Sequence, residues 1–267
     1  MTIEDYHIHS KYSFDGNMSF EEIVQESIKK NLSEIAVTDH IELAAPDIMT
    51  EFNVNAARME FDEVRAKYEG QITIKRGMEL GNAQLDMQQA DVLAQEFDGD
   101  FILGSVHNLK INHDVWYSDY RKINKKQFYH AYLDAVYEVA QKADYDVLAH
   151  ITYPSKGIYT QTGWRLDLKE YQKQFEKIFE AVISRGKGIE VNTSGFRVSL
   201  QETLPNEEIL KLYRDCGGTI ITVGSDAHQA EDIGEGIKEA MQCLKKLKFE
   251  GITTYTHRIA KQHCFGT

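Results

Sequence analysis

Ile220-Ile221-Thr222-Val223-Gly224-Ser225-Asp226-Ala227-His228 joins a short apolar run to a carboxylate and an imidazole. The β-branched residues of the run predict a buried strand that ends near Gly224. Asp226 and His228 follow, separated by one residue, so their side chains can share a direction. Imidazole and carboxylate are the usual protein ligands of zinc, manganese and iron. The stretch therefore predicts a strand that delivers metal ligands at its end.

The same combination recurs along the chain. Two histidines at alternate positions sit in the first apolar run, and later runs end in a histidine or a glutamate: His7, His9, His40, Glu79, His107 and His150. Taken singly, each residue also fits a purely structural role, such as a surface histidine, a helix cap or a hydrogen-bonded core residue. Because successive strand ends all carry one, we expect a single polar cavity that holds several metal ions.

The spacing of the apolar runs predicts an α/β fold. Seven strand-like runs alternate with helical patterns, at Ile3–Ile8, Glu34–Thr38, Ile72–Glu79, Phe101–Val106, Asp146–His150, Gly188–Asn192 and Thr219–Val223. This alternation fits an open doubly wound sheet or a closed barrel. An open sheet places only the strands near its switch point beside a ligand, whereas a barrel gathers the ends of all its strands. The ligands at nearly every strand end favour a seven-stranded barrel.

Several helices and irregular stretches can be placed as well. Ser19 and Glu22 form a capping box that opens a helix, which Asn31 can end. Other helical patterns lie at Lys125–Ala143, Tyr171–Ile183, Asp232–Lys246, Asn55–Tyr68 and Gln84–Phe97. The longest stretches expected to be irregular follow ligand-bearing strands and could line the cavity; they are Ile41–Val54, Asn108–Asn124 and Ile151–Asp167.

Composition narrows the class of protein. The chain has 267 residues and 42% hydrophobic content, enough for one domain spanning residues 1–267. The formal net charge of −12 argues against a nucleic-acid or anionic-membrane surface. Neither a secretory signal nor an apolar run of about 18 residues is expected. The odd cysteine count, without a CxxC spacing, fits a reduced cytoplasmic protein.

Residues after the sixth strand could bind substrate. Arg197 could grip a phosphate in a two-pronged contact or be a solvated loop arginine, and Ser194 lies close to it in sequence. Lys156 and Arg165 are weaker candidates of the same type. Trp116 and Tyr117 could stack on a ring, although packing is the more usual role of such residues.

In combination these motifs resemble the polymerase and histidinol phosphatase (PHP) family. The four matching stretches appear in order, as His7-Ile8-His9 with Ser13-Phe14-Asp15-Gly16, Thr38-Asp39-His40, Gly77-Met78-Glu79 with Gly104-Ser105-Val106-His107, and Gly224-Ser225-Asp226-Ala227-His228. The resemblance implies a distorted seven-stranded (β/α)7 barrel with its metal site at the carboxyl ends of the strands.

The resemblance also implies three divalent ions, with zinc, manganese and iron left open. The first would be held by His7, His9, Glu79 and Asp226. The second would share Glu79 and add His107 and His150. The third would be held by Asp15, His40 and His228, and some relatives have a histidine in the place of Asp15.

Within the family the chain is most similar to metal-dependent histidinol-phosphate phosphatases. This implies hydrolysis of L-histidinol phosphate to L-histidinol and phosphate, a step of histidine biosynthesis, with Arg197 and Ser194 on the substrate side. Asp226 or a metal-bound water could protonate the leaving group. Glu42 or Asp47 could face the cationic amine and imidazole.

Other functions stay open. A phosphotyrosine phosphatase of this family would have nearly the same metal site. A phosphodiesterase or nuclease would need a basic groove, which the net charge of −12 disfavours. A barrel that binds metal without catalysis is the alternative outside enzymes. The oligomeric state cannot be inferred.

Overall fold

The computed structural model describes residues 3–43, 54–110 and 114–265. Its main sheet contains seven parallel strands in the order β1-β2-β4-β5-β6-β7-β8. Their bounds are β1 Glu4–Ile8, β2 Glu34–Val37, β4 Thr73–Gly81, β5 Phe101–Ser105, β6 Val147–Leu148, β7 Gly188–Asn192 and β8 Ile221–Gly224. All seven expected strands are thus present, within a few residues of their expected bounds.

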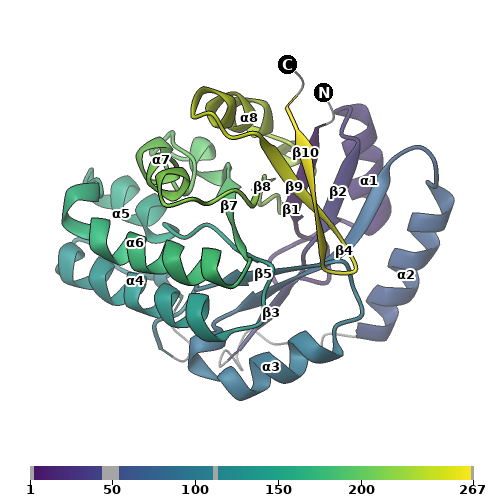
Figure 1. Ribbon diagram of the computed structural model, residues 1–267. Helices are drawn as coiled ribbons and strands as arrows, with labels where there is room; N and C mark the ends of the chain where they lie inside the picture. The colour runs from purple at the N-terminus through teal and green to yellow at the C-terminus, as the bar shows by residue number, and fades with distance from the viewer. Residues whose placement is uncertain (1–2, 44–53, 111–113, 266–267) are drawn as a thin grey trace.

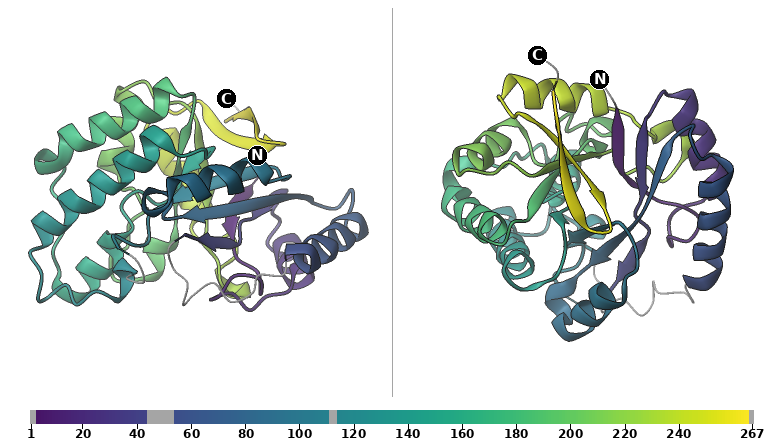
Figure 2. Two further views of the ribbon diagram at one scale, coloured as in Figure 1. Left: turned by 90° about the horizontal axis from the view of Figure 1, so that it is seen from below. Right: turned by 45° about the vertical axis from the view of Figure 1, so that its right-hand side comes forward.

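The sheet curves until its first and last strands meet. The backbone N–H of His9 donates to the carbonyl of Ala227 at 2.9 Å, and that of Asp226 donates to the carbonyl of His7 at 2.8 Å. These bonds join the chain just after β8 to β1, so the strands form a nearly closed barrel (Figure 2). The expected (β/α)7 barrel is confirmed.

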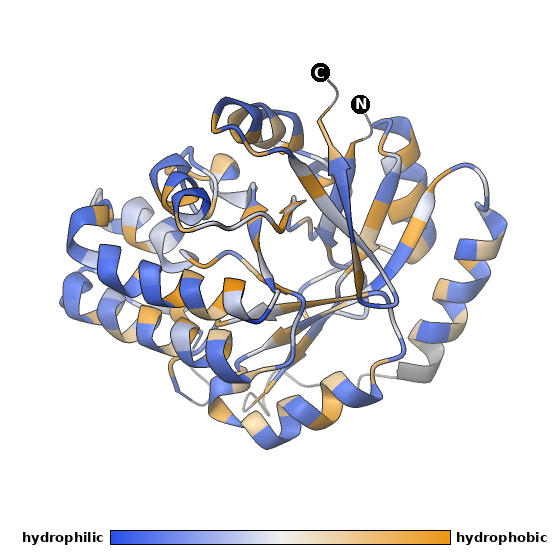
Figure 3. Cartoon of the chain, viewed as in Figure 1, coloured by the Kyte–Doolittle hydropathy of each residue, from blue (hydrophilic) through white to orange (hydrophobic). Residues whose placement is uncertain are grey.

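Helices surround the barrel (Figure 1). They are α1 Phe20–Lys29, α2 Val54–Lys67, α3 Met87–Glu96, α4 Lys125–Lys142, α5 Pro154–Thr162, α6 Leu168–Ser184, α7 Glu207–Asp215 and α8 Ile237–Lys246. Hydrophobic and hydrophilic residues alternate along them at helical spacing (Figure 3), and the buried ones pack on the sheet. The capping box is confirmed, because the Ser19 hydroxyl accepts from the N–H of Glu22 while the Glu22 carboxylate accepts from the N–H of Ser19.

Four expectations about local structure were wrong. The helix expected over Asp232–Lys246 begins only at Ile237, because Gly234 and Gly236 adopt left-handed backbone at φ 70° and 74°. The helix expected over Gln84–Phe97 is split, since the Asp86 side chain caps a fresh helix start. Helix α5 occupies a stretch expected to be irregular. Strand β3, His40–Glu42, pairs with β4 in another such stretch.

A C-terminal hairpin was not predicted. Strands β9 (Gly251–Thr256) and β10 (Ile259–Cys264) pair antiparallel and lie across the barrel (Figure 1). Tyr255 of β9 packs on Phe101, and its N–H donates to the Tyr6 hydroxyl at 3.0 Å. Phe101 is the first residue of β5, and Tyr6 comes before His7 and His9 in the chain. The hairpin therefore covers the amino-terminal end of the barrel and leaves the opposite end to the polar residues.

Two expectations drawn from composition can be compared with the structure. Cys216, Cys243 and Cys264 all lie in the described residues and form no disulfide. Among the helices of the described ranges, none has the length and hydropathy needed to cross a bilayer.

Candidate metal centre

Glu79 lies at the centre of the polar end of the barrel. It is fully buried on β4, the longest strand, and its two carboxylate oxygens face different histidines. Oε2 lies 3.1 Å from Nε2 of His7 and 3.5 Å from Nε2 of His9. Oε1 lies 3.2 Å from Nε2 of His107 and 3.0 Å from Nε2 of His150. One carboxylate therefore stands between two pairs of imidazoles.

Asp226 completes the side of the cluster occupied by His7 and His9. Its Oδ1 lies 3.4 Å from Nε2 of His9 and 3.7 Å from Nε2 of His7. Asp226 and His150 both have positive φ, at 57° and 22°, which is uncommon for residues other than glycine. Backbone strain of this kind is concentrated at functional sites, because the surrounding structure must hold it.

The remaining predicted ligands lie on the outer side of His9. Asp15 stands between two imidazoles, with its carboxylate 3.1 Å from Nε2 of His228 and 3.7 Å from Nε2 of His40. The other ring nitrogen of His40 lies 3.0 Å from Oε2 of Glu79. All nine residues expected to hold metal therefore come together at one end of the barrel, although they are spread from residue 7 to residue 228.

The spacing of these atoms fits metal coordination. Ligand atoms about 2.1 Å from a shared tetrahedral ion lie about 3.4 Å from one another. The separations around Glu79 lie close to that value. Four groups of three residues each place their ligand atoms within 4.8 Å of one another: His7–His9–Glu79, Glu79–His107–His150, His9–His40–His228 and His40–Glu42–His107. Within the described residues, Nε2 of His9 is buried without a hydrogen-bond partner, and a metal ion would satisfy it.

The electrostatics of the cluster favour a cation. Burial opposes ionisation of Glu79, but the surrounding His7, His40 and His107 hold its pKa well below the usual range. Burial likewise disfavours a charged His7, yet Glu190 and Glu79 raise its pKa. His9 responds differently, because burial and its neighbours His228 and His40 lower its pKa to about 3. The cluster thus combines ionised carboxylates with a neutral imidazole, which is the donor set of a divalent metal.

Polar groups behind the imidazoles fix their orientation. Nδ1 of His107 lies 2.7 Å from Oε1 of Glu42, and Nδ1 of His9 lies 3.1 Å from the Ser13 hydroxyl, which donates to Asp39 at 2.9 Å. Such partners set the tautomer of a ligand histidine. Glu42 is buried behind His107, away from the side chains that line the neighbouring cavity, so its contacts differ from those expected of a substrate-facing residue. Asp47 lies outside the described residues.

A cavity of about 310 Å³ opens beside the cluster, a volume within the range of small-molecule sites. Its lining combines predicted ligands with aromatic and charged residues: Phe14, Asp15, His40, His107, Asp114, Trp116, Tyr117, His150, Tyr153, Lys156, Asp226 and His228. Lys156 is the lysine of this lining, and burial lowers its pKa. The cavity therefore joins a metal-type cluster to one cation and an aromatic rim.

Arg197 and Ser194 lie next to this cavity. The Ser194 hydroxyl accepts from Nζ of Lys156 at 2.9 Å. Nη2 of Arg197 donates to the carbonyl of Asp226 at 2.9 Å, and its Nε lies 3.4 Å from Asp232. Nη1 of Arg197 is buried and has no hydrogen-bond partner in the part of the chain that is described. Arg197 therefore keeps one unsatisfied donor beside the cavity.

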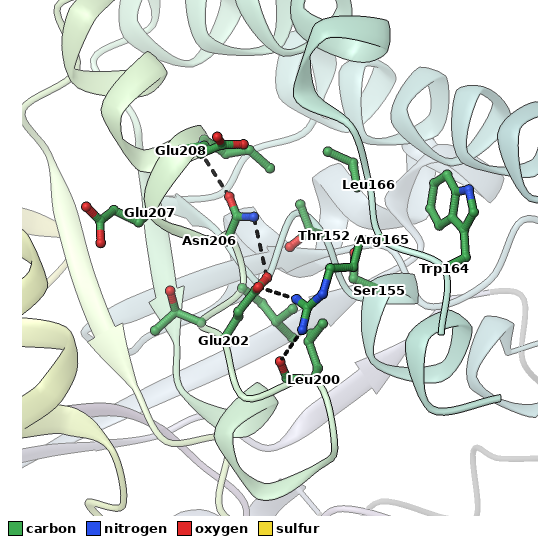
Figure 4. A pocket seen from close by; sticks show the side chains of 13 residues that line it. Thr152, Ser155, Trp164, Arg165, Leu166, Leu200, Glu202, Asn206, Glu207 and Glu208 are labelled. Carbon is green, nitrogen blue, oxygen red and sulfur yellow. Dashed lines mark hydrogen bonds and ion pairs between the residues drawn. The ribbon is translucent and has the colours of Figure 1, made fainter. Parts of the chain in front are cut away.

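A larger cavity, about 390 Å³, lies elsewhere, between α5 and the segment 200–209 (Figure 4). Arg165 points into it and is paired with Glu202, while its Nη2 donates to the carbonyl of Leu200 at 3.4 Å. The predicted metal ligands are absent from its described lining. Size alone therefore does not mark the site, and the contacts of Arg165 are with this second cavity.

Sequence reasoning missed two residues of the site. Glu190 is fully buried on β7, with Oε1 2.7 Å from Nδ1 of His7. A charged residue inside an otherwise apolar strand was the available signal. Asp114 lines the cavity and lies within Asn108–Asn124, a stretch expected to be irregular, where no sequence pattern marked a carboxylate.

Comparisons with known proteins agree with this geometry. A probable histidinol-phosphatase of Thermotoga maritima is 29% identical over 92% of this chain and 93% of its own length. The histidinol-phosphatase of Lactococcus lactis is 28% identical over 94% of each chain. The crystal structure of the histidinol phosphate phosphatase from Lactococcus lactis, complexed with zinc, L-histidinol and phosphate, superimposes with a TM-score of 0.86 at 27% identity, covering 98% of this chain and 99% of that one.

The family model of the PHP domain matches residues 5–194. The matched segment contains seven of the nine predicted ligands: His7, His9, Asp15, His40, Glu79, His107 and His150. Asp226 and His228 follow the matched segment and complete the same cluster. The chain belongs to the PHP domain family.

Proposed function

We propose that this chain hydrolyses L-histidinol phosphate to L-histidinol and phosphate. The observation that carries the proposal is the match over nearly the full length to a histidinol phosphate phosphatase, joined to a cluster whose ligand atoms have metal-binding separations. A lone metal site or a fold match would support much less, because one fold can host many activities.

The residues present fit a set of divalent ions. His7, His9, Glu79 and Asp226 would hold one, Glu79, His107 and His150 a second, and Asp15, His40 and His228 a third. Zinc, manganese and iron all suit these ligands. When bound, such ions supply hydroxide at neutral pH and offset the charge of the phosphoryl group. The two oxygens of Glu79 face the first two sets separately, which suits a bridging carboxylate.

The chain's own cations would bind the phosphate. Lys156 projects from α5 into the cavity, and Ser194 holds its ammonium group at 2.9 Å. Arg197 has one nitrogen without a partner in the described structure and is fixed beside Asp226 by the others. We assign these two residues to the phosphoryl oxygens, since hydrogen bonds from a cation to an anion are the strong ones. Asp226 lines the same cavity and is our candidate for moving a proton to the leaving oxygen.

Asp114 and the aromatic rim would face the organic half of the substrate. Its amine and imidazole can both be cationic, and Asp114 lies in the cavity lining beside Trp116. Oδ1 of Asp114 accepts from the N–H of Trp116 at 2.7 Å. Among the described residues its other oxygen has no hydrogen-bond donor, so it could accept from an ammonium or imidazolium group. Trp116 and Tyr117 are exposed enough to cover a bound ring. We now assign Glu42 to orienting His107, in place of its expected contact with the substrate.

The test is a steady-state comparison of substrates on one protein sample of known metal content. Phosphate release would be measured with histidinol phosphate, phosphotyrosine and a short oligonucleotide after loading with Zn²⁺ or Mn²⁺. We expect kcat/KM to be highest for histidinol phosphate by at least about tenfold, because that substrate offers Asp114 both an amine and an imidazole that can be cationic. A higher value for phosphotyrosine or the oligonucleotide would contradict the proposal, and no release from any of them would favour a binding protein.

A further inference from the structure

Glu190 touches two of the predicted ligands from behind. Its Oε1 lies 2.7 Å from Nδ1 of His7, and its Oε2 accepts from the backbone N–H of His150 at 2.9 Å. In front, Glu79 meets the same two residues, with Oε2 3.1 Å from Nε2 of His7 and Oε1 3.0 Å from Nε2 of His150. Two carboxylates therefore enclose His7 and His150 from opposite sides.

The contact with His7 decides where its ring proton lies. A carboxylate oxygen accepts hydrogen bonds, and the 2.7 Å contact therefore assigns Nδ1 of His7 as the donor to Glu190. In a neutral His7 this contact leaves the lone pair on Nε2, which faces Glu79 and Asp226, as a metal ligand requires. Burial of the whole pair, with Glu190 and His7 both at 0% exposure, keeps water from replacing this bond.

The contact with His150 holds a strained backbone. His150 has φ 22°, and its N–H donates to Glu190 instead of to a strand neighbour. Without that acceptor a buried N–H would lack a hydrogen-bond partner, which destabilises this conformation. Glu190 thus stabilises the conformation that aims the His150 ring at Glu79.

The packing around Glu190 leaves little room for another arrangement. A Cβ atom added at Gly224 would lie 2.4 Å from Oε1 of Glu190 and 2.4 Å from Cβ of His7. Only glycine fits at that point of β8, so the neighbouring strand is shaped around the Glu190–His7 pair. This feature of β8 is independent of the hydrogen bonds themselves.

A series of side-chain hydrogen bonds leads from Glu190 towards the cavity. Nδ2 of Asn192 donates to Oε2 of Glu190 at 3.2 Å, and Oδ1 of Asn192 accepts from the Ser194 hydroxyl at 2.6 Å. That hydroxyl in turn accepts from Nζ of Lys156 at 2.9 Å. The end of β7 therefore connects the backs of two predicted ligands with the cation proposed to bind phosphate.

We propose that Glu190 is a positioning residue that sets the tautomer of His7 and the backbone of His150, and so couples the first two metal sites. The inference rests on the metal centre of the proposed function. Glu190 touches neither the cavity nor the reacting atoms, and it acts only through the residues that it holds.

The test compares metal affinity in Glu190→Gln, Glu190→Asp and Asp146→Asn. Glutamine keeps the size of the side chain, but its amide can donate to Nδ1 of His7 and leave the proton on Nε2, where it blocks coordination. Asp146 is a matched control, because it is also a buried carboxylate that accepts from a backbone N–H, that of Ile102 at 2.8 Å, but it precedes β6 at the opposite end of the barrel.

Zinc affinity would be measured by competition with a chelating indicator, and the absorption spectrum of the Co²⁺-loaded protein would report the ligand geometry. Circular dichroism before metal is added would check that each variant folds. We expect Glu190→Gln to bind zinc about 10- to 100-fold more weakly and to change the Co²⁺ spectrum. Glu190→Asp should recover part of the affinity, and Asp146→Asn should match the wild type.

Equal affinity and equal spectra in Glu190→Gln and the wild type would overturn the inference, and so would the same loss in Asp146→Asn. If Glu190→Gln fails to fold, Glu190→Asp decides, and unchanged affinity there overturns the inference. These measurements involve no substrate. If the substrate assay favours a compound other than histidinol phosphate, the inference about Glu190 is therefore unaffected. If the wild type does not bind zinc, both the metal centre and the inference are overturned.

Discussion

The two ends of this barrel use the same residue types in opposite ways. At the carboxyl ends of the strands, the buried carboxylates of Glu79 and Asp226 face imidazoles at 3.0–3.7 Å. At the amino ends, the buried carboxylate of Asp146 faces the Arg258 guanidinium and a backbone N–H. The first arrangement offers lone pairs to a cation, whereas the second consumes them within the protein. Burial of charge thus marks function only where the partners are themselves ligands.

Removing metal should show the largest difference between the two ends of the barrel, because the predicted ligands lie only at the carboxyl end. Dialysis against a chelator is expected to abolish phosphatase activity and to lower the Tm, because ions that bind only the folded state stabilise it by mass action. Re-adding Zn²⁺ or Mn²⁺ should restore both. The check is activity and thermal unfolding on the same samples. Full activity with less than one bound ion per chain would show that the carboxyl-end cluster is not a metal centre.

Glu79→Gln tests the centre of that cluster. The amide cannot supply two anionic oxygens, so we expect kcat to fall by at least about 10³-fold, the loss of several kcal/mol of transition-state stabilisation. Metal content per chain should fall as well. Asp146→Asn is the control at the other end, with kcat expected to stay within about twofold of the wild type. A Glu79→Gln enzyme with normal turnover would remove the bridging role.

Lys156→Met tests the cation of the cavity. Loss of one charge-assisted hydrogen bond to phosphate, worth about 1.5–3 kcal/mol, predicts a 10- to 100-fold lower kcat/KM. Metal content should be unchanged, which distinguishes this variant from Glu79→Gln. Lys156→Arg, which keeps the charge, should recover part of the loss. Unchanged kinetics in Lys156→Met would show that Lys156 does not bind the phosphate, and Arg197 would then be the remaining candidate.

The sequence predicted the carboxyl end far better than the amino end. Strand-end ligands such as His107 and Asp226 follow a rule of parallel strands, so their convergence could be expected before any coordinates. The C-terminal hairpin follows no such local rule. Its turn residues, His257 and Arg258, have φ 49° and 62°, a conformation that normally calls for Asn or Gly.

Contacts from residues that precede β5 and β6 hold that turn. The N–H of His257 donates to Asp100 at 3.0 Å, and the side chain of Arg258 bonds to Asp144 and Asp146. Glu190 escaped prediction for a similar reason, since its importance lies in contacts with His7 and His150, 183 and 40 positions away. Residues that act by themselves can be found in a sequence, whereas residues that act through others need the fold.

Arg258→Met tests the amino end. The variant removes a guanidinium that pairs with Asp144 at 2.7 Å and with Asp146 at 3.1 Å, and it leaves the Asp146 carboxylate buried. We expect the free energy of unfolding to fall by about 2 kcal/mol, measured by urea titration. Turnover per folded molecule should stay unchanged, because the hairpin lies at the far end of the barrel. Loss of metal in this variant would show that the two ends are coupled.

The smallest expected effect is on the pH dependence of stability. Hydrogen bonds from Arg258 hold the pKa of Asp144 below its usual value, whereas burial raises the pKa of Asp146 despite the same arginine. As pH falls below about 4, the unfolded state binds a proton at Asp144 before the folded state does, so the stabilisation from Asp144 is present above that pH and is lost as pH falls through the folded pKa. Asp146 has the opposite sign, because its ionised form is the one that burial disfavours.

Asp144→Asn should therefore lose less stability than the wild type between pH 5 and about 3, by under about 1 kcal/mol since Asp144 is 41% exposed. Asp146→Asn should lose more. Urea titrations at several pH values check both signs, and parallel curves for the two variants would mean that the arginine does not distinguish its two carboxylates.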